Sequence, residues 1–381
     1  MYNEVTTFIR NLYNKPTDLV PLHAPVFTGN EKKYLNECID TTFVSYVGRF
    51  VTLFEEKIAA YTGAKYAVAV VNGTCALEIA LKLCGVKSGD EVLTQALTFV
   101  ATSNAIAYCG GNIVFIDSEK QNLGMCPEKL EEFLTENTEI RADGYCYNKN
   151  TNNKVSACVP VHIFGHPCLI DKINEICSKH NIVVVEDAAE SIGSTYFGKH
   201  TGTFGKTAVL SFNGNKTITT GGGGMIITDD EQLAKKAKYI TTTAKVPHPY
   251  EFFHDELGYN YRMTNVNAAI GCAQMEKLDE YIANKRETAA LYKEFFAKQK
   301  IEFFSEKENC FSNYWLNVII LKDREQREDF LKYTNENGVM TRPAWTLMNK
   351  LPMYKNCLHT NLDNAQWLED RIVNIPSSVR L

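Results

Sequence analysis

The sequence lacks three features that would place it in a specialised class of protein. No stretch approaches the roughly 18–20 consecutive apolar residues of a membrane span, and no run of lysine and arginine residues is present. The twelve cysteines form no CxxC pair and no finger-like spacing with histidine. The formal net charge of -5 provides no positive field for nucleic acid. We therefore expect no membrane span, no nucleic-acid partner and no structural metal.

The cysteines that are present lie mostly inside apolar stretches, as Cys158 and Cys272 do. Buried free thiols are typical of a reducing compartment. The segment before Pro16 mixes polar and charged side chains and lacks the apolar core of a signal peptide. We expect a cytoplasmic protein.

Short apolar runs alternate with amphipathic helical patterns through the first two thirds of the 381-residue chain. The apolar runs predict buried strands at 65–71, 91–94, 112–116, 157–161, 181–185, 208–212 and 224–228. The helical patterns predict helices at 74–84, 101–108, 127–135, 169–179 and 230–243. This alternation is typical of an α/β fold with a mostly parallel central sheet covered by helices on both faces. In such a fold, ligands bind at the carboxyl ends of the strands.

The pattern changes in two places. Residues 136–154 are rich in Asn, Thr and Lys and predict an exposed hairpin or loop. The last third of the chain predicts a long helix at 265–297, a strand at 316–321 and a helix at 324–336. We expect a large α/β domain at 20–250 and a smaller C-terminal α+β domain at 251–381, with residues 1–19 packed on the smaller domain.

Lys216 is the most informative residue for function. It follows a predicted strand, and an acidic residue, Asp187, ends another predicted strand upstream. A lysine amine forms a Schiff base with the aldehyde of pyridoxal phosphate, and a buried acid keeps the pyridine nitrogen protonated. Alone, Lys216 is more typical of a solvated surface lysine, and Asp187 also fits a helix cap. Together the two residues favour a cofactor site.

Three further features lie at the ends of predicted strands. The turn at Asn72, Gly73 and Thr74 offers backbone N–H groups at a helix N-terminus to a phosphate, although a plain turn with Thr74 as N-cap fits equally well. Phe99 is able to lie flat against a planar ring, although a core phenylalanine is the commoner case. Glu190 is separated from Asp187 by two small alanines, and the two carboxylates then face one pocket.

Two motifs are ambiguous on local grounds. The four glycines at 221–224 fit neither nucleotide-binding fingerprint and predict a tight turn into the following strand. The polar residues at 258–264 fit a capping cluster before a helix as well as a set of groups that reach an anionic ligand.

Taken in order, these segments resemble the DegT/StrS-type sugar aminotransferase family, within the fold-type I pyridoxal phosphate enzymes. The resemblance covers most of the chain, from Pro21 to Pro376. The matching motifs are Asn72-Gly73-Thr74, the segments 98–102, 161–166 and 186–190, Ser211-Phe212 with Lys216, and the segment 258–262. The resemblance implies a homodimer with composite active sites.

The resemblance also implies roles for individual residues. Lys216 is the expected Schiff-base lysine, Asp187 the partner of the pyridine nitrogen, and Phe99 the residue that stacks on the ring. Glu190 is expected near the phenolic oxygen of the cofactor. The expected phosphate ligands are Gly73, Thr74, Cys75 and Ser211, joined by Asn260 of the neighbouring subunit. Relatives commonly carry alanine in place of Cys75, and a backbone contact survives that change.

Within the family, the segment that contains His166 and the segment around Trp315 look most like the branch that acts on UDP-linked 4-keto-6-deoxy-N-acetylhexosamines, in bacillosamine and legionaminic acid biosynthesis. Trp315 stands where relatives often have a histidine near the substrate diphosphate. Arg262 and Arg342 are the candidates for the missing positive charge. The implied reaction transfers an amino group from L-glutamate to the C4 ketone of the nucleotide sugar.

Three other functions are weighed against this one. A dehydratase that uses the aminated cofactor is disfavoured, because those relatives carry histidine at the position of Lys216. A 3-aminotransferase acting on a dTDP-3-keto-6-deoxyhexose is the main alternative within the fold. A non-catalytic sensor would bind the sugar nucleotide or the cofactor without amino transfer, and the intact pair of Lys216 and Asp187 disfavours it.

Overall fold

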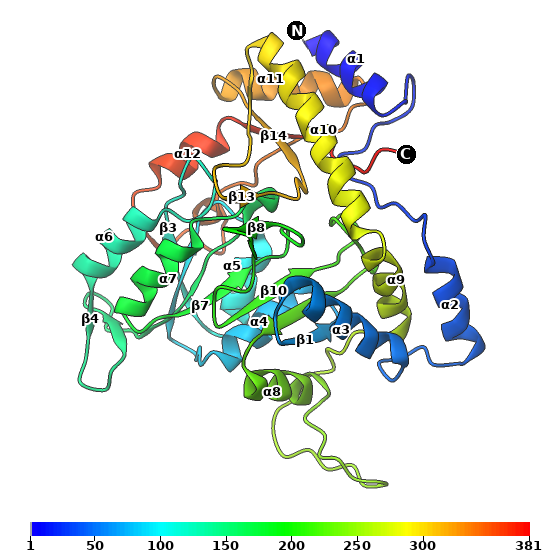
Figure 1. The fold of residues 1–381 in the computed structure, drawn as a ribbon. Coiled ribbons are helices and arrows are strands. Elements are labelled where there is room, and N and C mark those ends of the chain that lie inside the picture. Colours follow the sequence, from blue (N-terminus) through cyan, green and yellow to red (C-terminus); the bar gives the residue numbers. More distant parts are fainter. Residues whose placement is uncertain (1) are drawn as a thin grey trace.

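The computed structural model describes residues 2–381 and contains one large eight-stranded sheet (Figure 1). In spatial order its strands are β1 (Tyr66–Val70), β11 (Gly224–Thr228), β10 (Thr207–Ser211), β7 (Val183–Asp187), β6 (Val155–Val159), β2 (Glu91–Gln95), β3 (Asn112–Ile116) and β16 (Leu358–His359). Only β11 runs antiparallel to its neighbours among the strands of this sheet in residues 2–381. The predicted α/β class with a mostly parallel sheet is confirmed.

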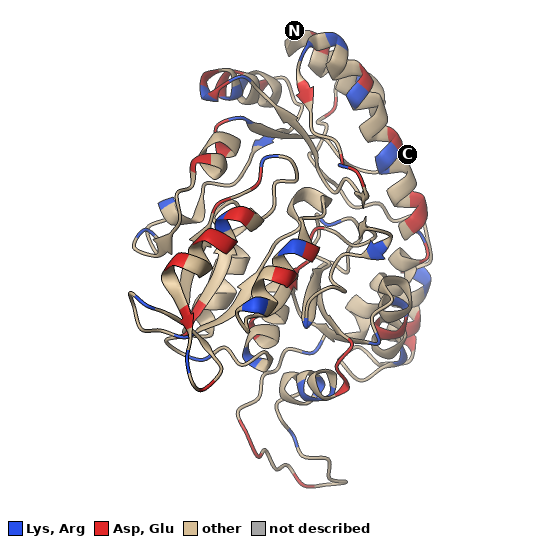
Figure 2. Ribbon diagram, turned by 60° about the vertical axis from the view of Figure 1, so that its left-hand side comes forward, with Lys and Arg blue, Asp and Glu red and all other residues tan. Residues whose placement is uncertain are grey.

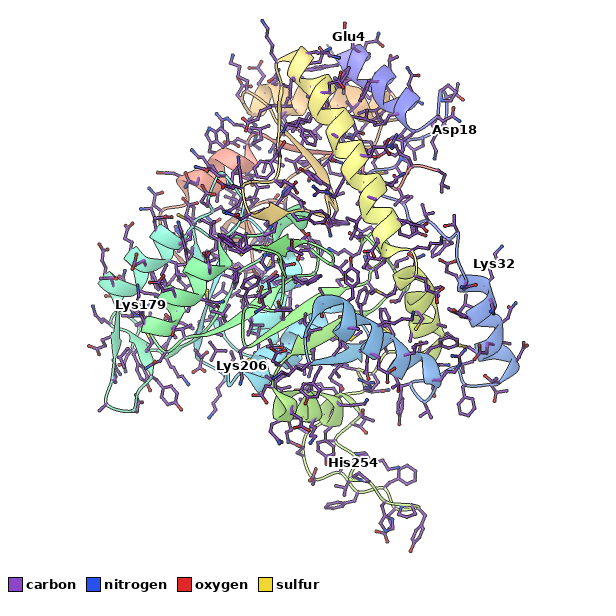
Figure 3. The ribbon with its side chains drawn as sticks, viewed as in Figure 1. Glu4, Asp18, Lys32, Lys179, Lys206 and His254 are labelled. Atoms are coloured by element: carbon purple, nitrogen blue, oxygen red, sulfur yellow. The ribbon has the colours of Figure 1, made fainter. Side chains whose placement is uncertain are left out.

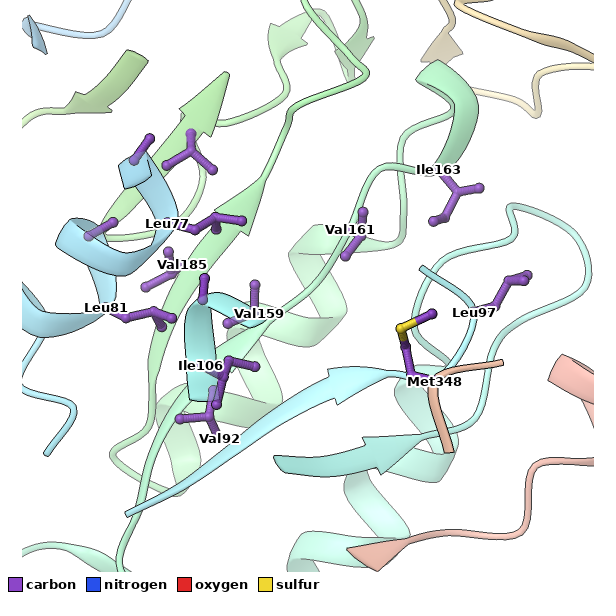
Figure 4. Close-up of a cluster of buried hydrophobic side chains, with 14 of the residues drawn as sticks. Leu77, Leu81, Val92, Leu97, Ile106, Val159, Val161, Ile163, Val185 and Met348 are labelled. Atoms are coloured by element: carbon purple, nitrogen blue, oxygen red, sulfur yellow. The ribbon is translucent and has the colours of Figure 1, made fainter. Parts of the chain in front are cut away.

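One face of this sheet is covered by three helices, which are α4 (Gly73–Leu83), α5 (Val100–Tyr108) and α8 (Glu231–Thr241). Alternate strand residues point to opposite faces, so Val92, Val159 and Val185 lie on this side. Figure 4 shows them packed with Leu77 of α4 and Ile106 of α5. All five side chains are buried, and this contact orients the helix that begins at Gly73.

The opposite face is covered by four helices, which are α3 (Arg49–Thr62), α6 (Pro127–Asn137), α7 (Ile170–Lys179) and α9 (Asn265–Met275). The strand neighbours of the residues just described, such as Leu93 and Val184, pack on α6 and α7. Leu210 and Ile227 pack on α3 and α9. The sheet is therefore apolar on both faces, which is why its strands read as nearly continuous apolar runs in the sequence.

A second sheet of four antiparallel strands forms the smaller unit. Its order is β12 (Glu302–Phe303), β14 (Asn317–Ile320), β17 (Ile372–Ile375) and β15 (Arg342–Pro343). Three helices pack on it, which are α1 (Tyr2–Leu12), α10 (Leu278–Gln299) and α11 (Arg324–Glu336). Ile9 and Phe330 share a core with Tyr292, so the N-terminal helix lies on this unit, beside α11 (Figure 1).

The structure differs from the expected organisation in two respects. The predicted helix at 265–297 is wrong as a single helix: it is interrupted at Glu276 and Lys277, between α9 and α10. In addition, α9 and β16 lie beyond residue 250 but belong to the layers of the large sheet. The division into two domains at residue 250 therefore stays a proposal. Two separate cores are present, but the chain beyond residue 250 contributes α9 and β16 to the larger one.

The remaining elements are short or peripheral. The segment 136–154 forms the predicted hairpin, with strands β4 (Thr138–Ile140) and β5 (Cys146–Asn148). The others are α2 (Glu31–Asp40), α12 (Asp363–Glu369), β8 (Thr195–Tyr196), β9 (Lys199–His200), β13 (Cys310–Phe311) and the 3-10 turns η1 (Ile163–Gly165) and η2 (Met348–Lys350).

The surface carries charges of both signs on elements throughout the molecule (Figure 2). All twelve cysteines are free thiols, and most of them are buried as expected. Among residues 2–381, no helix combines the length and the apolar character needed to cross a bilayer.

Candidate active site

A cavity of about 250 Å³ lies where the carboxyl ends of β1, β2, β6, β7 and β10 meet. The loops that leave these strands form most of its wall, and Trp315 and Trp345 come from the part of the chain beyond α10. Eight of the predicted site residues line it, namely Gly73, Thr74, Phe99, Asp187, Glu190, Ser211, Lys216 and Trp315. The predicted binding edge of the sheet is thus where these side chains meet.

Lys216 lies in the turn that follows β10. Its backbone N–H donates to the carbonyl of Asn213 at 3.0 Å, which closes the turn. The Nζ atom lies 3.3 Å from Glu190 Oε1 and 3.9 Å from the centre of the Trp315 ring. The side chain is only 12% exposed. The alternative of a solvated surface lysine is therefore wrong, and the amine faces the cavity.

Asp187 is the last residue of β7 and is buried. Its Oδ2 accepts a hydrogen bond from the hydroxyl of Thr102 at 2.8 Å, and its Oδ1 accepts one from the backbone N–H of Ala189 at 3.2 Å. Burial raises the pKa of Asp187, and the hydrogen bonds with Thr102 and Ala189 oppose this rise. A cationic partner in the cavity is what would restore the ordinary acidity of this carboxyl.

Glu190 is buried on the same wall. Its Oε2 accepts from the backbone N–H of Phe164 at 2.7 Å, which leaves Oε1 to face Lys216. Burial raises the pKa of Glu190, while the nearby ammonium of Lys216 lowers it. Two carboxyl groups and one amine thus share a small, largely desolvated space.

The N-terminus of α4 forms the opposite end of the cavity. Its N-cap is Asn72, whose Oδ1 accepts from the N–H of Cys75 at 2.8 Å, so the alternative with Thr74 as N-cap is wrong. The first N–H groups of a helix have no intrahelical acceptor, and those of Gly73 and Thr74 lie at the cavity wall. A Cβ on Gly73 would come within 3.1 Å of the Cβ of Ser211, so a side chain at this position would crowd the serine on the cavity wall.

The glycine run supports the start of α4 indirectly. Gly221 has φ +82 and makes the tight turn predicted before β11. A Cβ on Gly224 would lie 2.4 Å from the carbonyl oxygen of Asn72. The strand can therefore pass behind the start of α4 only because this residue has no side chain.

Aromatic side chains form the rest of the wall. Phe99 is 51% exposed, so it is not a core residue, and its ring centre lies 6.1 Å from that of Trp345. Trp345 also packs on Phe164, with ring centres 4.9 Å apart. Sequence reasoning missed Trp345 and the role of Thr102. The scarcity of tryptophan, at three residues, was the one available signal for Trp345.

The other five predicted site residues do not line the cavity. Arg262 is buried and engaged, because its guanidinium binds Glu55 Oε1 at 2.7 Å and the carbonyl of Ala69 at 2.8 Å. Arg342 is exposed at the edge of the smaller sheet and donates to Asn335. Neither arginine is therefore free at the cavity of this chain to bind a diphosphate.

The other three are placed as follows. His166 is buried between the rings of Phe304 and Tyr314, with ring centres at 4.8 and 5.2 Å, and burial lowers its pKa to about 3. Asn260 is exposed, away from the cavity of its own chain. Cys75 is half-buried in the first turn of α4, and its N–H already donates to Asn72 Oδ1.

An arm formed by residues 244–258 projects from the body after α8 (Figures 1 and 3). Figure 3 labels His254 on this arm, and its Nδ1 lies 2.8 Å from the carbonyl oxygen of Thr243, just before the arm. The arm exposes four large apolar side chains, and Phe252 is 80% exposed. The others are Tyr250, Phe253 and Leu257. A patch of this kind marks an interaction surface.

Comparisons with known proteins identify the family of the chain. The model of the DegT/DnrJ/EryC1/StrS aminotransferase family matches residues 26–381. The chain is 38% identical over 360 residues to GDP-perosamine synthase of Escherichia coli O157:H7, covering 94% of this chain and 93% of that protein. It is 36% identical to a Bacillus subtilis protein named as a pyridoxal phosphate-dependent aminotransferase, covering 92% and 87%. The crystal structure of the aminotransferase TlmJ from Streptoalloteichus hindustanus matches with a TM-score of 0.85 at 24% identity, covering 94% and 93%.

Proposed function

The chain belongs to the DegT/DnrJ/EryC1/StrS aminotransferase family, and on this premise we propose that it transfers an amino group from L-glutamate to the C4 ketone of a nucleotide-linked 6-deoxy sugar. Proteins of this family are pyridoxal phosphate-dependent sugar aminotransferases. The observation that carries the proposal is the meeting of Lys216, Asp187 and the N-terminus of α4 in one cavity.

Three features of this cavity fit pyridoxal phosphate. The free N–H groups at the start of α4 and the hydroxyl of Ser211 form an anion cradle that a Cβ on Gly73 would crowd. The buried carboxyl of Asp187 suits a pyridinium N–H. The amine of Lys216 suits the aldehyde. Because the N–H of Cys75 already binds Asn72, we assign the phosphate to Gly73, Thr74 and Ser211 within this chain.

When bound, the cofactor supplies an aldehyde that exchanges amines and a ring that accepts electrons. Asp187 would keep the ring nitrogen protonated, and the hydroxyl of Thr102, which donates to Oδ2, would orient this carboxyl. Phe99, at the N-cap of α5, would cover one face of the ring. These residues bind and orient, and they lie on rigid strand ends and helix starts.

We assign the proton transfer to Lys216. Its Nζ removes a proton from the α-carbon of glutamate and later delivers one to the sugar carbon that becomes the amine-bearing centre. Glu190 Oε1, at 3.3 Å, is within reach to share this proton. Because burial raises the pKa of Glu190, its carboxyl is closer to accepting a proton at neutral pH than an exposed glutamate.

Two alternatives remain for the nucleotide of the substrate. The sequence motifs favour a UDP-linked 4-keto-6-deoxy-N-acetylhexosamine. The relatives named GDP-perosamine synthase, a 4-amino-sugar enzyme, favour a GDP-linked 4-keto-6-deoxyhexose. The wall formed by Trp315 and Trp345 suits the apolar face of a sugar ring in either case. Both substrates share the C4 ketone, which is the part we propose.

We further propose that two copies of the chain form a homodimer. The arm at 244–258 exposes Tyr250, Phe252, Phe253 and Leu257, and the loop at 41–48 exposes Phe43, Val44, Tyr46 and Val47. Asn265 holds this loop through the carbonyl of Phe43 at 2.7 Å and the N–H of Phe50 at 3.0 Å. The exposed Asn260, at the base of the arm, is then available to the phosphate in the partner's cavity.

Replacement of the central amine tests the proposal. Lys216→Ala removes the group that binds the cofactor covalently and moves the proton, so amino transfer should fall by at least about a thousandfold. The absorbance band of the Schiff base between the protein and pyridoxal phosphate should disappear as well. Lys206→Ala is a matched control, because Lys206 is exposed and pairs with Asp230.

A panel of keto-sugar nucleotides tests the substrate. The purified enzyme is incubated with glutamate and GDP-linked 4-keto, UDP-linked 4-keto or dTDP-linked 3-keto sugars, and the products are identified by NMR. An amine at C4 supports the proposal, and the faster nucleotide decides between the two alternatives. Amination at C3 alone, or residual transfer by the Lys216→Ala variant at the rate of the unmodified enzyme, would refute it.

A further inference from the structure

Lys285 is a fully buried lysine in the middle of α10. Its ammonium contacts three acceptors, which are the carbonyl of Trp315 at 3.2 Å, the carbonyl of Ser377 and Nε2 of His23 at 3.0 Å. Burial lowers the pKa of His23, so its imidazole is neutral and accepts this hydrogen bond. No carboxylate among the described residues pairs with Lys285.

Such a placement is unfavourable for stability alone. An ammonium without a counter-ion loses its hydration on burial, and burial lowers the pKa of Lys285 to about 7. An apolar side chain of similar length would fill the same space without this penalty. The position therefore calls for a role beyond core packing.

Trp315 is the one of its three partners that lines the cavity. The residue is held at two other points: its N–H donates to Asn313 Oδ1 at 2.7 Å, and its indole N–H donates to the carbonyl of Asn215 at 2.6 Å. Asn215 immediately precedes Lys216 in the sequence. Displacement of Trp315 would therefore change both the wall of the cavity and the turn that carries the reactive amine.

The backbone before Trp315 does not hold this position by itself. Tyr314 has φ +46, in the left-handed region that a tyrosine adopts only under restraint from its surroundings. The segment also lies just before β14, outside the regular ladder of the smaller sheet. External hydrogen bonds are what fix such a segment, and Lys285 provides one to its carbonyl.

We propose that Lys285 is a positioning residue that holds Trp315 against the Lys216 amine through the Trp315 carbonyl. The inference rests on the proposed function only in treating this cavity as the cofactor site. Lys285 does not touch the cavity. Its contribution is to fix the distance between the indole ring and Nζ of Lys216, which is 3.9 Å.

A double-mutant cycle tests this assignment. Lys285→Met keeps the length of the side chain and removes the ammonium, and Trp315→Phe keeps the carbonyl and removes the indole. We expect Lys285→Met to weaken binding of pyridoxal phosphate to the apoprotein by about tenfold, measured by absorbance titration. In the Trp315→Phe background the same change should have almost no effect, because the side chain through which Lys285 acts is gone.

Fluorescence of the apoprotein provides a readout that involves no cofactor and no activity. With Trp345→Phe and Trp367→Phe, Trp315 is the only tryptophan left. We expect Lys285→Met in this background to shift its emission to longer wavelength and to increase its quenching by acrylamide. This arm stays informative even if the sugar substrate proposed above is wrong.

Tyr292→Phe is the matched structural control. Tyr292 lies on the same helix, is buried, and donates to the carbonyl of Pro376 at 3.0 Å, next to Ser377. It should lower stability without changing Trp315 emission or cofactor binding. Lys285→Gln, which keeps an N–H donor without the charge, provides a milder variant and should give intermediate values. The proposal would be overturned if the losses of pyridoxal phosphate affinity caused by Lys285→Met and Trp315→Phe simply multiplied in the double variant. It would also be overturned if Lys285→Met and Lys285→Gln left the emission of Trp315 unchanged.

Discussion

At the scale of single residues, Glu186 and Asp187 are adjacent carboxylates with different tasks. Glu186 points away from the cavity and accepts from the backbone N–H groups of Gly202, Phe204 and Gly205 at 2.8, 2.7 and 2.6 Å, and it pairs with His162 at 3.0 Å. Asp187 faces the opposite way because strand side chains alternate. Its hydrogen-bond partners leave it accessible to a ligand, so Asp187 alone of the two serves the site.

Thr102 should affect cofactor binding through Asp187. Thr102→Val removes the hydroxyl that donates to Oδ2 and that opposes the burial-induced rise in the pKa of Asp187. The carboxyl then carries less negative charge toward the ring nitrogen. We expect the affinity for pyridoxal phosphate to fall roughly tenfold, as for the loss of one charge-assisted hydrogen bond.

Absorbance titration of the apoprotein measures this change. Thr334→Val is the control, since Thr334 is a buried threonine whose hydroxyl binds Phe330 and Thr341 within the smaller unit. It should lose stability without losing cofactor affinity. Equal affinity of the Thr102→Val and unmodified proteins would show that the hydroxyl does not orient Asp187.

His166 should make the fold sensitive to acid. Burial lowers its pKa to about 3 from the ordinary 6.5, so the folded protein keeps the ring neutral where the unfolded chain protonates it. The stability from this residue is complete above pH 6.5 and is lost as the pH falls toward 3. Between pH 7.5 and 5 the loss should reach about 2 kcal/mol.

His166→Phe keeps an aromatic ring between Phe304 and Tyr314 but cannot be protonated. Urea unfolding at pH 7.5 and 5 should show a smaller drop in the free energy of unfolding for this variant. His359→Phe, at an exposed position, should behave like the unmodified protein. An unchanged pH dependence in His166→Phe would mean that His166 is not responsible.

At the scale of elements, the sequence was sufficient for every strand of the large sheet except β16. Its apolar runs place β1, β2, β3, β10 and β11 within a residue or two of their observed bounds, because each strand is buried on both faces. The same pattern places the carboxyl ends, and with them Lys216, Asp187 and Glu190, at one edge of the sheet. The core of the site is therefore predictable from local patterns.

Elements and contacts set by tertiary packing were not predictable. The break between α9 and α10 has no proline or glycine to announce it; instead Glu276 at the break binds Asn30 and Tyr34 of the α2 region. The pairing of Arg262 with Glu55, which removes the arginine from the substrate, joins residues far apart in the sequence. Trp345 reaches the cavity only because the smaller unit packs over the strand ends. No local pattern encodes these approaches.

At the scale of the whole molecule, the arm at 244–258 should control assembly and activity together. Replacing Tyr250, Phe252, Phe253 and Leu257 with serine removes an exposed apolar surface without disturbing a core. From the proposed homodimer we expect a folded protein of half the mass of the unmodified protein by sedimentation. Amino transfer should fall at least about tenfold, because in that proposal Asn260 would no longer reach a partner cavity. A four-serine variant that sediments like the unmodified protein and keeps its activity would argue against the dimer.

The return of β16 to the edge of the large sheet has a consequence for biosynthesis. Its two residues, Leu358 and His359, pair with Val114 and Phe115 of β3, which lie far upstream in the chain. On the ribosome, the outer edge of β3 stays unpaired until Leu358 and His359 have emerged. The large sheet is therefore completed late in synthesis. Until then, the unpaired edge of β3 is able to pair with other nascent chains on the same mRNA.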